Sequence, residues 1–356
     1  MISMKIFFDL LRDALWRNDS DIQLKELSDD EIAQVLSIAE KQAVSGLIID
    51  SLFRHDVRMP QQWVFETIGL LEQIKQQSRA INLGAVKLNE LMSDDGIGYV
   101  IVKGQTVASK YPDPLIRQSG DIDYYCDAKN FPLSQTAIKK YLGTEPKRDV
   151  SDRHVHFNYQ EVTYEGHFSL TSMYNKKRDQ YWQWLLDNDN GTIVDIAGNQ
   201  IKTLSPTLHT LYIFIHLYCH LLALGVGLRQ FCDLAVMLHY CKMQIDMKAL
   251  KIQLGELGLE RAYKACGAIL IDRLGSSQED LGYRLTDSDR KYGDKILDIV
   301  MYRGNMGHYN KRNGFSGWKH KMEALGIKVS HFVKLMPLAP GYSCGWLWHE
   351  ITRQAK

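Results

Sequence analysis

The sequence has little that would assign it at once to a special class of protein. Its 356 residues carry a formal net charge of +1, since 43 lysines and arginines stand against 42 aspartates and glutamates. This balance gives no general attraction to polyanions, so we do not expect a nucleic-acid partner. The chain also lacks internal repeats and low-complexity tracts. Its 45% hydrophobic and 24% charged residues are typical of a globular protein.

Cysteines and long apolar runs are also scarce. The six cysteines form no CxxC pair and lie mostly in apolar or helical stretches, so we expect reduced thiols in the core. Asp9, Arg12 and Asp13 interrupt the apolar amino-terminal segment, which therefore lacks the continuous core of a secretory signal. No run reaches the roughly 18 uncharged apolar residues of a membrane-spanning helix. We therefore expect a cytoplasmic protein with no membrane partner.

Hydrophobic spacing divides the chain into three regions. Residues 1–95 carry apolar side chains at helical intervals and form an N-terminal helical region. Residues 96–204 alternate strand-like and helix-like patterns. Residues 205–356 return to helical periodicity. The predicted fold class is α+β, with a small mixed β-sheet core flanked by N-terminal and C-terminal helical regions.

Individual elements follow from local signals. Ser28 followed by Glu31 has the form of a capping box, and Ser205-Pro206 has the form of an N-cap with proline at the first helical position. In the core we expect strands at 99–102, 121–126, 154–159, 162–168 and, as a last edge strand, 198–204, with helices at 105–110, 131–142 and 176–186. Further helices are expected at 206–224, 228–241, 246–255, 258–274, 287–301 and 320–335. The glycine-rich segment 304–317 is a candidate mobile loop.

Two carboxylates dominate the chemistry of the core. Asp121 and Asp123 are two apart on a predicted strand, so their side chains point to the same face while Ile122 points to the core. At 5 to 6 Å and an effective dielectric near 20 they repel by about 3 kcal/mol. A proton, a basic partner or a divalent metal must offset this repulsion. Mg²⁺ fits, because it binds one or two carboxylates and completes its shell with water and substrate phosphates.

A phosphate site is expected just before these carboxylates. A predicted strand ends at Lys103-Gly104 and a helix begins at once, so backbone N–H groups at the junction form an anion site that glycine leaves open. Lys103 and Arg117 are positioned to add charge-assisted contacts to phosphates. Arg117 has a second possible role, because it could instead brace Asp121 and Asp123. Together the two features suggest phosphoryl transfer.

In this order the residues resemble the uncharacterised nucleotidyltransferase family of the polymerase-β-type nucleotidyltransferase superfamily. The resemblance covers about residues 98–235. It is carried by Lys103-Gly104, Ala108, Tyr111, Asp113-Pro114, Arg117, Asp121-Ile122-Asp123, Glu165-Gly166-His167, Leu204-Ser205-Pro206, His209, His216, Leu228-Arg229 and Asp233. The superfamily usually opens its phosphate loop with Gly-Ser. Here Lys103-Gly104-Gln105 takes that place, so a serine contact to phosphate is not expected.

The resemblance implies a metal-dependent transfer of a nucleoside monophosphate from an NTP to an acceptor, with release of pyrophosphate. It implies two Mg²⁺ ions, with Mn²⁺ as a substitute, held by Asp121, Asp123 and, as third ligand, Glu165. Asp127 and Asp195 are the fallback candidates for the third position. The acceptor would be a small molecule, such as a sugar derivative, or a protein. Two other functions fit the same fold: a catalytically inactive nucleotide-sensing or interaction protein, and a toxin- or antitoxin-like nucleotidyltransferase.

Several side chains have two interpretations. His154, His156 and His167 lie on paired strands and could hold zinc, but no ligand set of fixed spacing completes them. His216 and His220, four apart on a helix, are better explained as residues of the core or of the site wall, because the HEXXH pattern is absent.

Arg229 and Asp233 are also ambiguous. They are one helical turn apart and either pair with each other or leave Arg229 free to reach the nucleotide. The aromatic cluster Tyr181, Trp182 and Trp184 is expected to serve packing and not base stacking.

Overall fold

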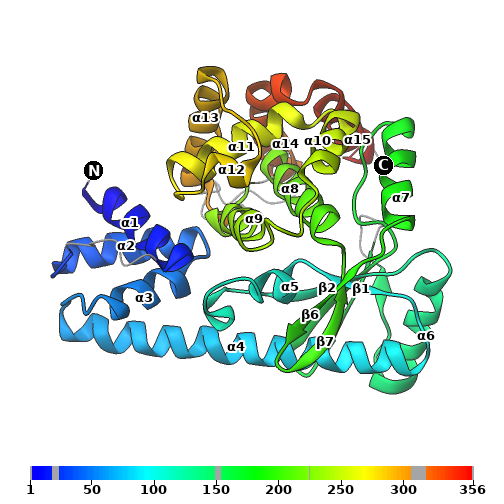
Figure 1. Cartoon of the computed structure of the whole chain (residues 1–356), viewed down its shortest axis with the longest axis horizontal. Helices are drawn as coiled ribbons and strands as arrows, with labels where there is room; N and C mark the ends of the chain where they lie inside the picture. The colour runs from blue at the N-terminus through cyan, green and yellow to red at the C-terminus, as the bar shows by residue number, and fades with distance from the viewer. Residues whose placement is uncertain (1, 18–23, 149–153, 224, 306–317, 355–356) are drawn as a thin grey trace.

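The computed structural model describes residues 2–17, 24–148, 154–223, 225–305 and 318–354. It confirms the predicted α+β class, because a small mixed sheet lies between helical regions (Figure 1). The N-terminal helices are α1 (Ile2–Trp16), α2 (Asp29–Lys41), α3 (Ser45–Arg54) and α4 (Gln61–Asp94). The helices of the core are α5 (Gly104–Ala108), the 3-10 turn η1 (Pro114–Ile116), α6 (Asn130–Leu142) and α7 (Lys176–Asp187).

The C-terminal region is helical, as predicted. Its helices are α8 (Pro206–Leu222), α9 (Leu228–Tyr240), α10 (Met247–Leu257), α11 (Glu260–Asp272), α12 (Gln278–Leu281), α13 (Asp287–Arg303), α14 (Trp318–Leu335), the 3-10 turn η3 (Met336–Leu338) and α15 (Pro340–Gln354). The sequence did not signal α12, which is one turn long, or α15. The segment 304–317, predicted to be a mobile loop, lies outside the described residues from position 306 onward.

Within the described residues, the main sheet has five strands in the order β1-β2-β5-β4-β3. They are β1 (Val100–Val102), β2 (Asp121–Tyr125), β3 (Lys147–Arg148), β4 (His154–Tyr159) and β5 (Val162–His167). Only the pairing of β2 with β5 is parallel, and the other three pairings are antiparallel. The strands predicted at 154–159 and 162–168 are joined by a two-residue turn, in which Gln160 and Glu161 both have positive φ, at 47° and 64°. Paired positive φ values give a turn whose twist suits a hairpin.

The last predicted strand was placed in the wrong sheet. It exists as β7 (Asn199–Thr203), but it pairs with β6 (Thr192–Ile196) in a separate two-stranded hairpin. β6 was missed because Asp195 breaks its short apolar run. Val194 and Ile201 face the same hydrophobic cluster as α4, so the hairpin is anchored by side-chain burial and not by pairing with the main sheet.

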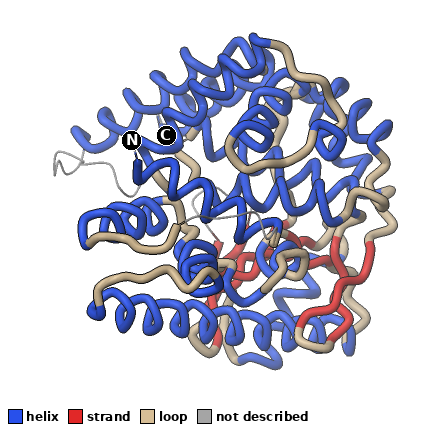
Figure 2. The backbone as a smooth tube through the Cα atoms, turned by 60° about the vertical axis from the view of Figure 1, so that its left-hand side comes forward, coloured by secondary structure: helices blue, strands red, loops and turns tan. Residues whose placement is uncertain are grey.

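The two faces of the main sheet differ. Ile122 and Tyr164 point to one face, where they pack with Leu88 of α4 and Ile138 of α6 in one hydrophobic cluster. Figure 1 shows α4 running along this side of the sheet. Since side chains alternate along a strand, Asp123 points to the opposite face, toward α8 and α9. Figure 2 shows the strands gathered at one side of a largely helical molecule.

The N-terminal helices close back on the C-terminal helices. Phe7 of α1 and Leu47 of α3 belong to the same hydrophobic cluster as Phe231 of α9. At the start of α2, the predicted capping box is confirmed: the Glu31 amide donates to Ser28 Oγ, and the Ser28 amide donates to the Glu31 carboxylate. Ser205 precedes α8 as expected but makes no side-chain cap, and its amide donates to Asp189 Oδ2.

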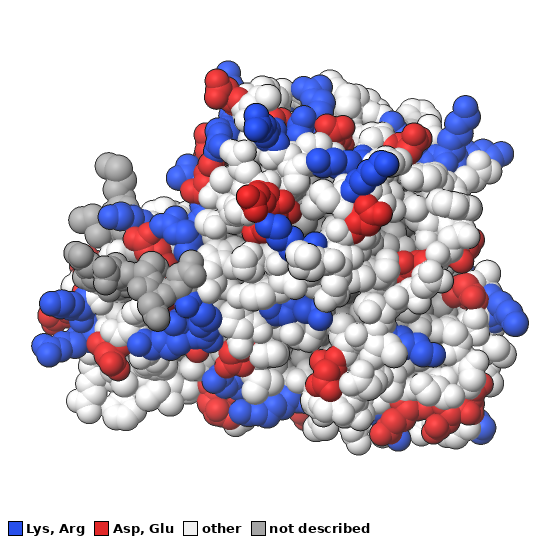
Figure 3. Space-filling view, viewed as in Figure 1, with Lys and Arg blue, Asp and Glu red and all other residues white. Residues whose placement is uncertain are grey.

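The helix lengths, the surface charges and the cysteines can be compared with what the composition predicts. In the part of the chain that is described, every helix is too short or too polar to cross a membrane. Figure 3 shows basic and acidic side chains interspersed on one face of the molecule, in keeping with the balanced composition. All six cysteines are free thiols, and four are buried. Cys344 is exposed, so the expectation of core thiols does not hold for it.

Gly166 is required by close packing in β5. An added Cβ would lie 2.2 Å from the hydroxyl of buried Tyr124 on the adjacent strand. We predict that Gly166→Ala lowers the free energy of unfolding by about 1–3 kcal/mol, the usual cost of overpacking. Gly255→Ala in α10 is the control, because nothing lies within 4 Å of its added Cβ and alanine favours a helix. Chemical denaturation measures both, and equal stability of Gly166→Ala and wild type would contradict the packing argument.

Candidate functional site

The polar face of the sheet forms the floor of a cavity of about 520 Å³, walled by α8 and α9. This volume is in the range of small-molecule sites. All seven site residues predicted from the sequence line it: Lys103, Gly104, Arg117, Asp121, Asp123, Glu165 and Arg229. Side chains that the prediction did not assign to the site also line it, among them Ser119, Tyr212, Gln230 and Asn305. The sequence carries no signal for these four, because they come from segments that meet only in the folded chain.

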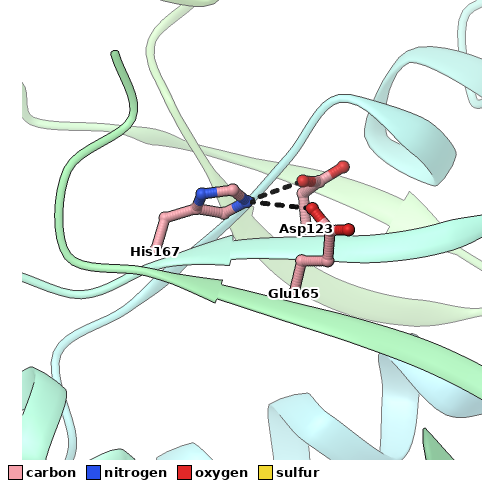
Figure 4. Close-up of side chains that lie close together, drawn as sticks. All are labelled: Asp123, Glu165 and His167. Atoms are coloured by element: carbon pink, nitrogen blue, oxygen red, sulfur yellow. Dashed lines mark hydrogen bonds and ion pairs between the residues drawn. The ribbon is translucent and has the colours of Figure 1, made fainter. Parts of the chain in front are cut away.

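A cluster of potential metal ligands lies on β2 and β5. The parallel register places Asp123 opposite Glu165. The ligand atoms of Asp123, Glu165 and His167 all lie within 4.8 Å of one another (Figure 4). His167 Nε2 is 2.7 Å from Asp123 Oδ1 and 3.8 Å from Glu165 Oε2. The three side chains therefore converge on one point, from which a divalent ion could be held.

Asp121 adjoins the cluster on the same strand face. Repulsion by Asp123, together with burial, raises the pKa of Asp121 above its ordinary value. Burial acts in the same direction on Asp123, but the charge of Lys103 and the hydrogen bond from His167 outweigh it and lower the pKa of Asp123 well below its usual range. The repulsion expected from the sequence is therefore present, and it appears as the raised pKa of Asp121.

Lys103 is placed by an unusual backbone. It follows β1 with φ 56°, and Gly104 follows with φ 43°. Its Nζ lies 2.9 Å from Asp123 Oδ1, and its side chain is 15% exposed. Burial disfavours the charge, but Asp123 overcomes this effect and raises the pKa of Lys103. The ammonium thus pairs with a site carboxylate while still lining the cavity.

The backbone of the predicted anion site is partly engaged. The Lys103 amide donates to His209 Nε2 at 3.1 Å. Burial lowers the pKa of His209 to about 3, so the ring is neutral and able to accept. The Lys103 amide is therefore not available to the anion site predicted at the strand–helix junction. Gly104 of that junction lines the cavity, as the prediction requires.

Arg117 does not brace the two aspartates of β2. It makes a bidentate pair with Asp233 of α9, with both N–O distances 2.7 Å, and the Tyr111 hydroxyl donates to the same carboxylate at 2.7 Å. Arg117 and Asp233 are 5% and 8% exposed. Burial opposes both charges, yet the pairing raises the pKa of Arg117 and lowers that of Asp233. Arg117 acts on the site by fixing the loop before β2.

Arg229 acts on the same loop. Its Nη1 donates to the Gln118 carbonyl at 2.7 Å, and Asp233, its suggested partner, pairs with Arg117 instead. Nε of Arg229 is buried with no hydrogen-bond partner among the described residues. Burial lowers the pKa of Arg229, but a guanidinium remains protonated in proteins, so the side chain is a cation. It is the cationic group of the cavity best placed to receive an anion.

The remaining histidines divide into two groups. His216 and His220 of α8 line the cavity with ring centroids 4.3 Å apart. Burial lowers the pKa of His220 to about 4 and that of His216 well below its ordinary value, so both rings are neutral. His154 lines the cavity and places its Nε2 3.9 Å from Glu165 Oε2. His156 lies outside the cavity lining, so no three-histidine zinc site forms among the described residues.

The fallback acids and aromatic residues have structural roles. Asp127 accepts the amides of Lys129 and Asn130 at the start of α6, and Asp195 accepts the Gly198 amide in the β6–β7 turn. Neither lines the cavity. The aromatic residues of α7 pack as expected: Trp182 stacks near Tyr212, and Tyr181 stacks on Trp184.

A larger cavity of about 1050 Å³ lies between α7, β1 and the β6–β7 hairpin. Its carboxylates are engaged in local structure: Asp127 as described above, Asp187 by Gln183, and Asp189 by the amides of Gly191 and Ser205. It brings together no cluster of metal ligands within the described chain. The smaller cavity is therefore our candidate functional site.

Comparison with known proteins identifies the family. The model of a family described as uncharacterised nucleotidyltransferase matches residues 28–274, more than half of the chain, so this chain belongs to that family. The match extends well beyond the span 98–235 recognised from motifs. Among curated proteins, none matches the sequence.

One solved structure shows a slight likeness. It is the crystal structure of an antigenic nucleotidyltransferase-like protein from Paracoccidioides brasiliensis, 15% identical, covering 59% of this chain and 94% of that chain with a TM-score of 0.36. At that TM-score, the likeness has no bearing on the function of this chain.

The Arg117–Asp233 pair yields a prediction about stability. Asp233→Asn leaves the buried guanidinium without its counter-ion, so we expect the free energy of unfolding to fall by about 3–5 kcal/mol. Because folding lowers the pKa of Asp233, the loss should be complete above the unfolded value of about 3.9 and should shrink as pH falls below it. Denaturant titrations at neutral and acid pH measure this difference.

The control for this variant is Asp294→Asn. Asp294 is paired with Arg273 at the surface, where its side chain is 68% exposed, so little change is expected. If Asp233→Asn is as stable as Asp294→Asn at neutral pH, the pair does not hold the loop as described.

Proposed function

We propose that this protein is a metal-dependent nucleotidyltransferase that moves a nucleoside monophosphate from an NTP to a small-molecule or protein acceptor. The proposal rests chiefly on one observation: the converging ligand atoms of Asp123, Glu165 and His167 on the floor of the cavity. Membership of the nucleotidyltransferase family supports the class of reaction.

The donor set is suited to a divalent ion. Asp123 and Glu165 offer hard oxygen ligands, and Asp121 adds a third carboxylate beside them. The raised pKa of Asp121 reflects negative charge that the Lys103 ammonium does not fully offset. When bound, a divalent ion would supply charge stabilisation for the phosphates of the nucleotide. Asp123 and Glu165 would hold it.

The cations of the cavity have complementary tasks. Arg229 is free at Nε and faces the loop before β2, so it is our candidate for binding the triphosphate. Lys103 is held at Asp123 and adds positive charge at the same point. Arg117, which is occupied by Asp233, positions Ser119 through a hydrogen bond of 2.5 Å and does not bind phosphate itself.

The reaction needs no protein nucleophile. An acceptor oxygen forms a bond to the α-phosphorus, the bond from that phosphorus to the oxygen bridging to the β-phosphate breaks, and pyrophosphate leaves with the bonding electrons. The proton of the acceptor hydroxyl passes to a site carboxylate. Asp121 is our candidate for this carboxylate, because it lines the cavity beside Asp123 without being one of the two residues that we assign to the ion.

We predict that Glu165→Gln reduces pyrophosphate release by at least about 100-fold, since loss of a metal-binding carboxylate removes several kcal/mol of charge stabilisation. Glu165 is preferable to Asp123 for this test, because its side chain is 31% exposed and its loss leaves no buried lysine unpaired. Pyrophosphate release is measured with each of the four NTPs and a mixture of candidate acceptors.

The matched control is Glu161→Gln, the same change at an exposed position of the same hairpin. It should keep the wild-type rate. Nucleotide binding by wild type with no pyrophosphate release, across a broad acceptor screen, would contradict the enzymatic proposal and favour a nucleotide-sensing protein. Equal rates in Glu165→Gln and wild type would contradict the assignment of the site.

A further inference from the structure

The group of potential metal ligands formed by Asp123, Glu165 and His167 includes a nitrogen atom, whereas Mg²⁺ prefers oxygen ligands. His167 Nε2 faces the carboxylates of both Asp123 and Glu165, and Figure 4 shows the ring directed into the gap between them. The side chains of His167 and Asp123 are only 9% and 4% exposed. The imidazole is therefore part of the cluster itself and not a surface group beside it.

The separations are those of ligands around one ion. With metal–ligand bonds of about 2.1 Å, neighbouring ligand atoms of an octahedral ion lie about 3.0 Å apart and opposite ones about 4.2 Å apart. The distances from His167 Nε2 to Asp123 and Glu165, 2.7 Å and 3.8 Å, are close to this interval. The three side chains are thus arranged for a shared ion with only small movements.

Charge also favours an ion at this point. Asp121, Asp123 and Glu165 meet at the cavity floor, while Arg117 is neutralised by Asp233. The cations left to offset three carboxylates are Lys103 and Arg229. Excess negative charge that is partly removed from water is unfavourable in free energy, and a bound divalent cation would offset it.

We propose that His167 Nε2 is a direct ligand of the ion held by Asp123 and Glu165, and that this ligand makes the site prefer Mn²⁺ to Mg²⁺. The inference rests on the proposed function, whose ion it specifies. Mg²⁺ demands near-ideal octahedral geometry and keeps its waters, so an imidazole nitrogen is a poor ligand for it. Mn²⁺ shares the preference of Mg²⁺ for carboxylates, but it also belongs to the first-row transition ions, which bind nitrogen ligands. Between these two ions, Mn²⁺ therefore suits this mixed set of ligands better.

The test uses the full-length protein with Mn²⁺ alone, without nucleotide. Pulsed electron paramagnetic resonance of bound Mn²⁺ detects a directly coordinated imidazole through coupling to its ¹⁴N nucleus. We expect this coupling in wild type and its loss in His167→Gln. His156→Gln is the matched control, because His156 is on the adjacent strand but outside the ligand cluster. It should keep the coupling.

Two spectroscopic outcomes would overturn the inference. Bound Mn²⁺ without nitrogen coupling in wild type would show that His167 only donates a hydrogen bond to Asp123. Coupling that persists in His167→Gln and disappears in His154→Gln would assign the ligand to His154, whose Nε2 lies 3.9 Å from Glu165. The wild-type spectrum decides the first point even if a variant fails to fold.

Calorimetric titration tests the preference itself. We expect Mn²⁺ to bind wild type about tenfold or more tightly than Mg²⁺. We expect His167→Gln to lose about tenfold or more in Mn²⁺ affinity, since losing even a residue that only orients a metal ligand has an effect of this size. Equal or tighter binding of Mg²⁺ would overturn the preference. Pyrophosphate release with either ion would uphold the proposed function independently, so the two proposals can fail separately.

Discussion

The parallel pairing of β2 with β5 is the contact on which the candidate site depends. Its register sets Asp123 beside Glu165 and Tyr125 beside His167, so the ligand-bearing side chains meet on one face. Slipping the register by one residue would turn Glu165 and His167 toward the apolar core. Gly166 makes the pairing possible, because the ring of Tyr124 occupies the space where any larger side chain would stand. This glycine stands between two residues of the candidate site, so the packing that requires it also sets their positions.

The C-terminal helices take part in the site and are not a separate flank. Asp233 of α9 binds the Arg117 side chain, and Arg229 of the same helix donates to the Gln118 carbonyl. Two residues of α9 therefore hold the loop that leads into β2. His209 of α8 accepts the Lys103 amide at the other end of the site. Both helices therefore hold backbone segments that lead to the carboxylates of β2.

The sequence predicted what local patterns encode. The strand bearing Asp121 and Asp123, the two strands at 154–159 and 162–168 and the Ser28 cap were all predicted, because period-2 alternation and capping chemistry are local. The partner of Arg117 was not: Asp233 is 116 residues away, and only folding shows that the two meet. His167 was placed correctly next to the strand that carries His154, its register partner, but the sequence did not show that the parallel register also brings it to Asp123. The β7 strand was misplaced because pairing partners are set by tertiary burial.

A thermal-shift titration with ATP, GTP, CTP and UTP, each with and without Mn²⁺ or Mg²⁺, tests most directly whether this cavity is a metal-dependent nucleotide site. A ligand at a hundred times its Kd stabilises the native state by about 2.7 kcal/mol, which is readily seen as a rise in Tm. The account predicts such a rise for at least one nucleotide, only in the presence of metal, and its loss in Asp123→Asn relative to that variant's own baseline. No metal-dependent shift with any of the four nucleotides, or the same shift in Asp123→Asn, would contradict it.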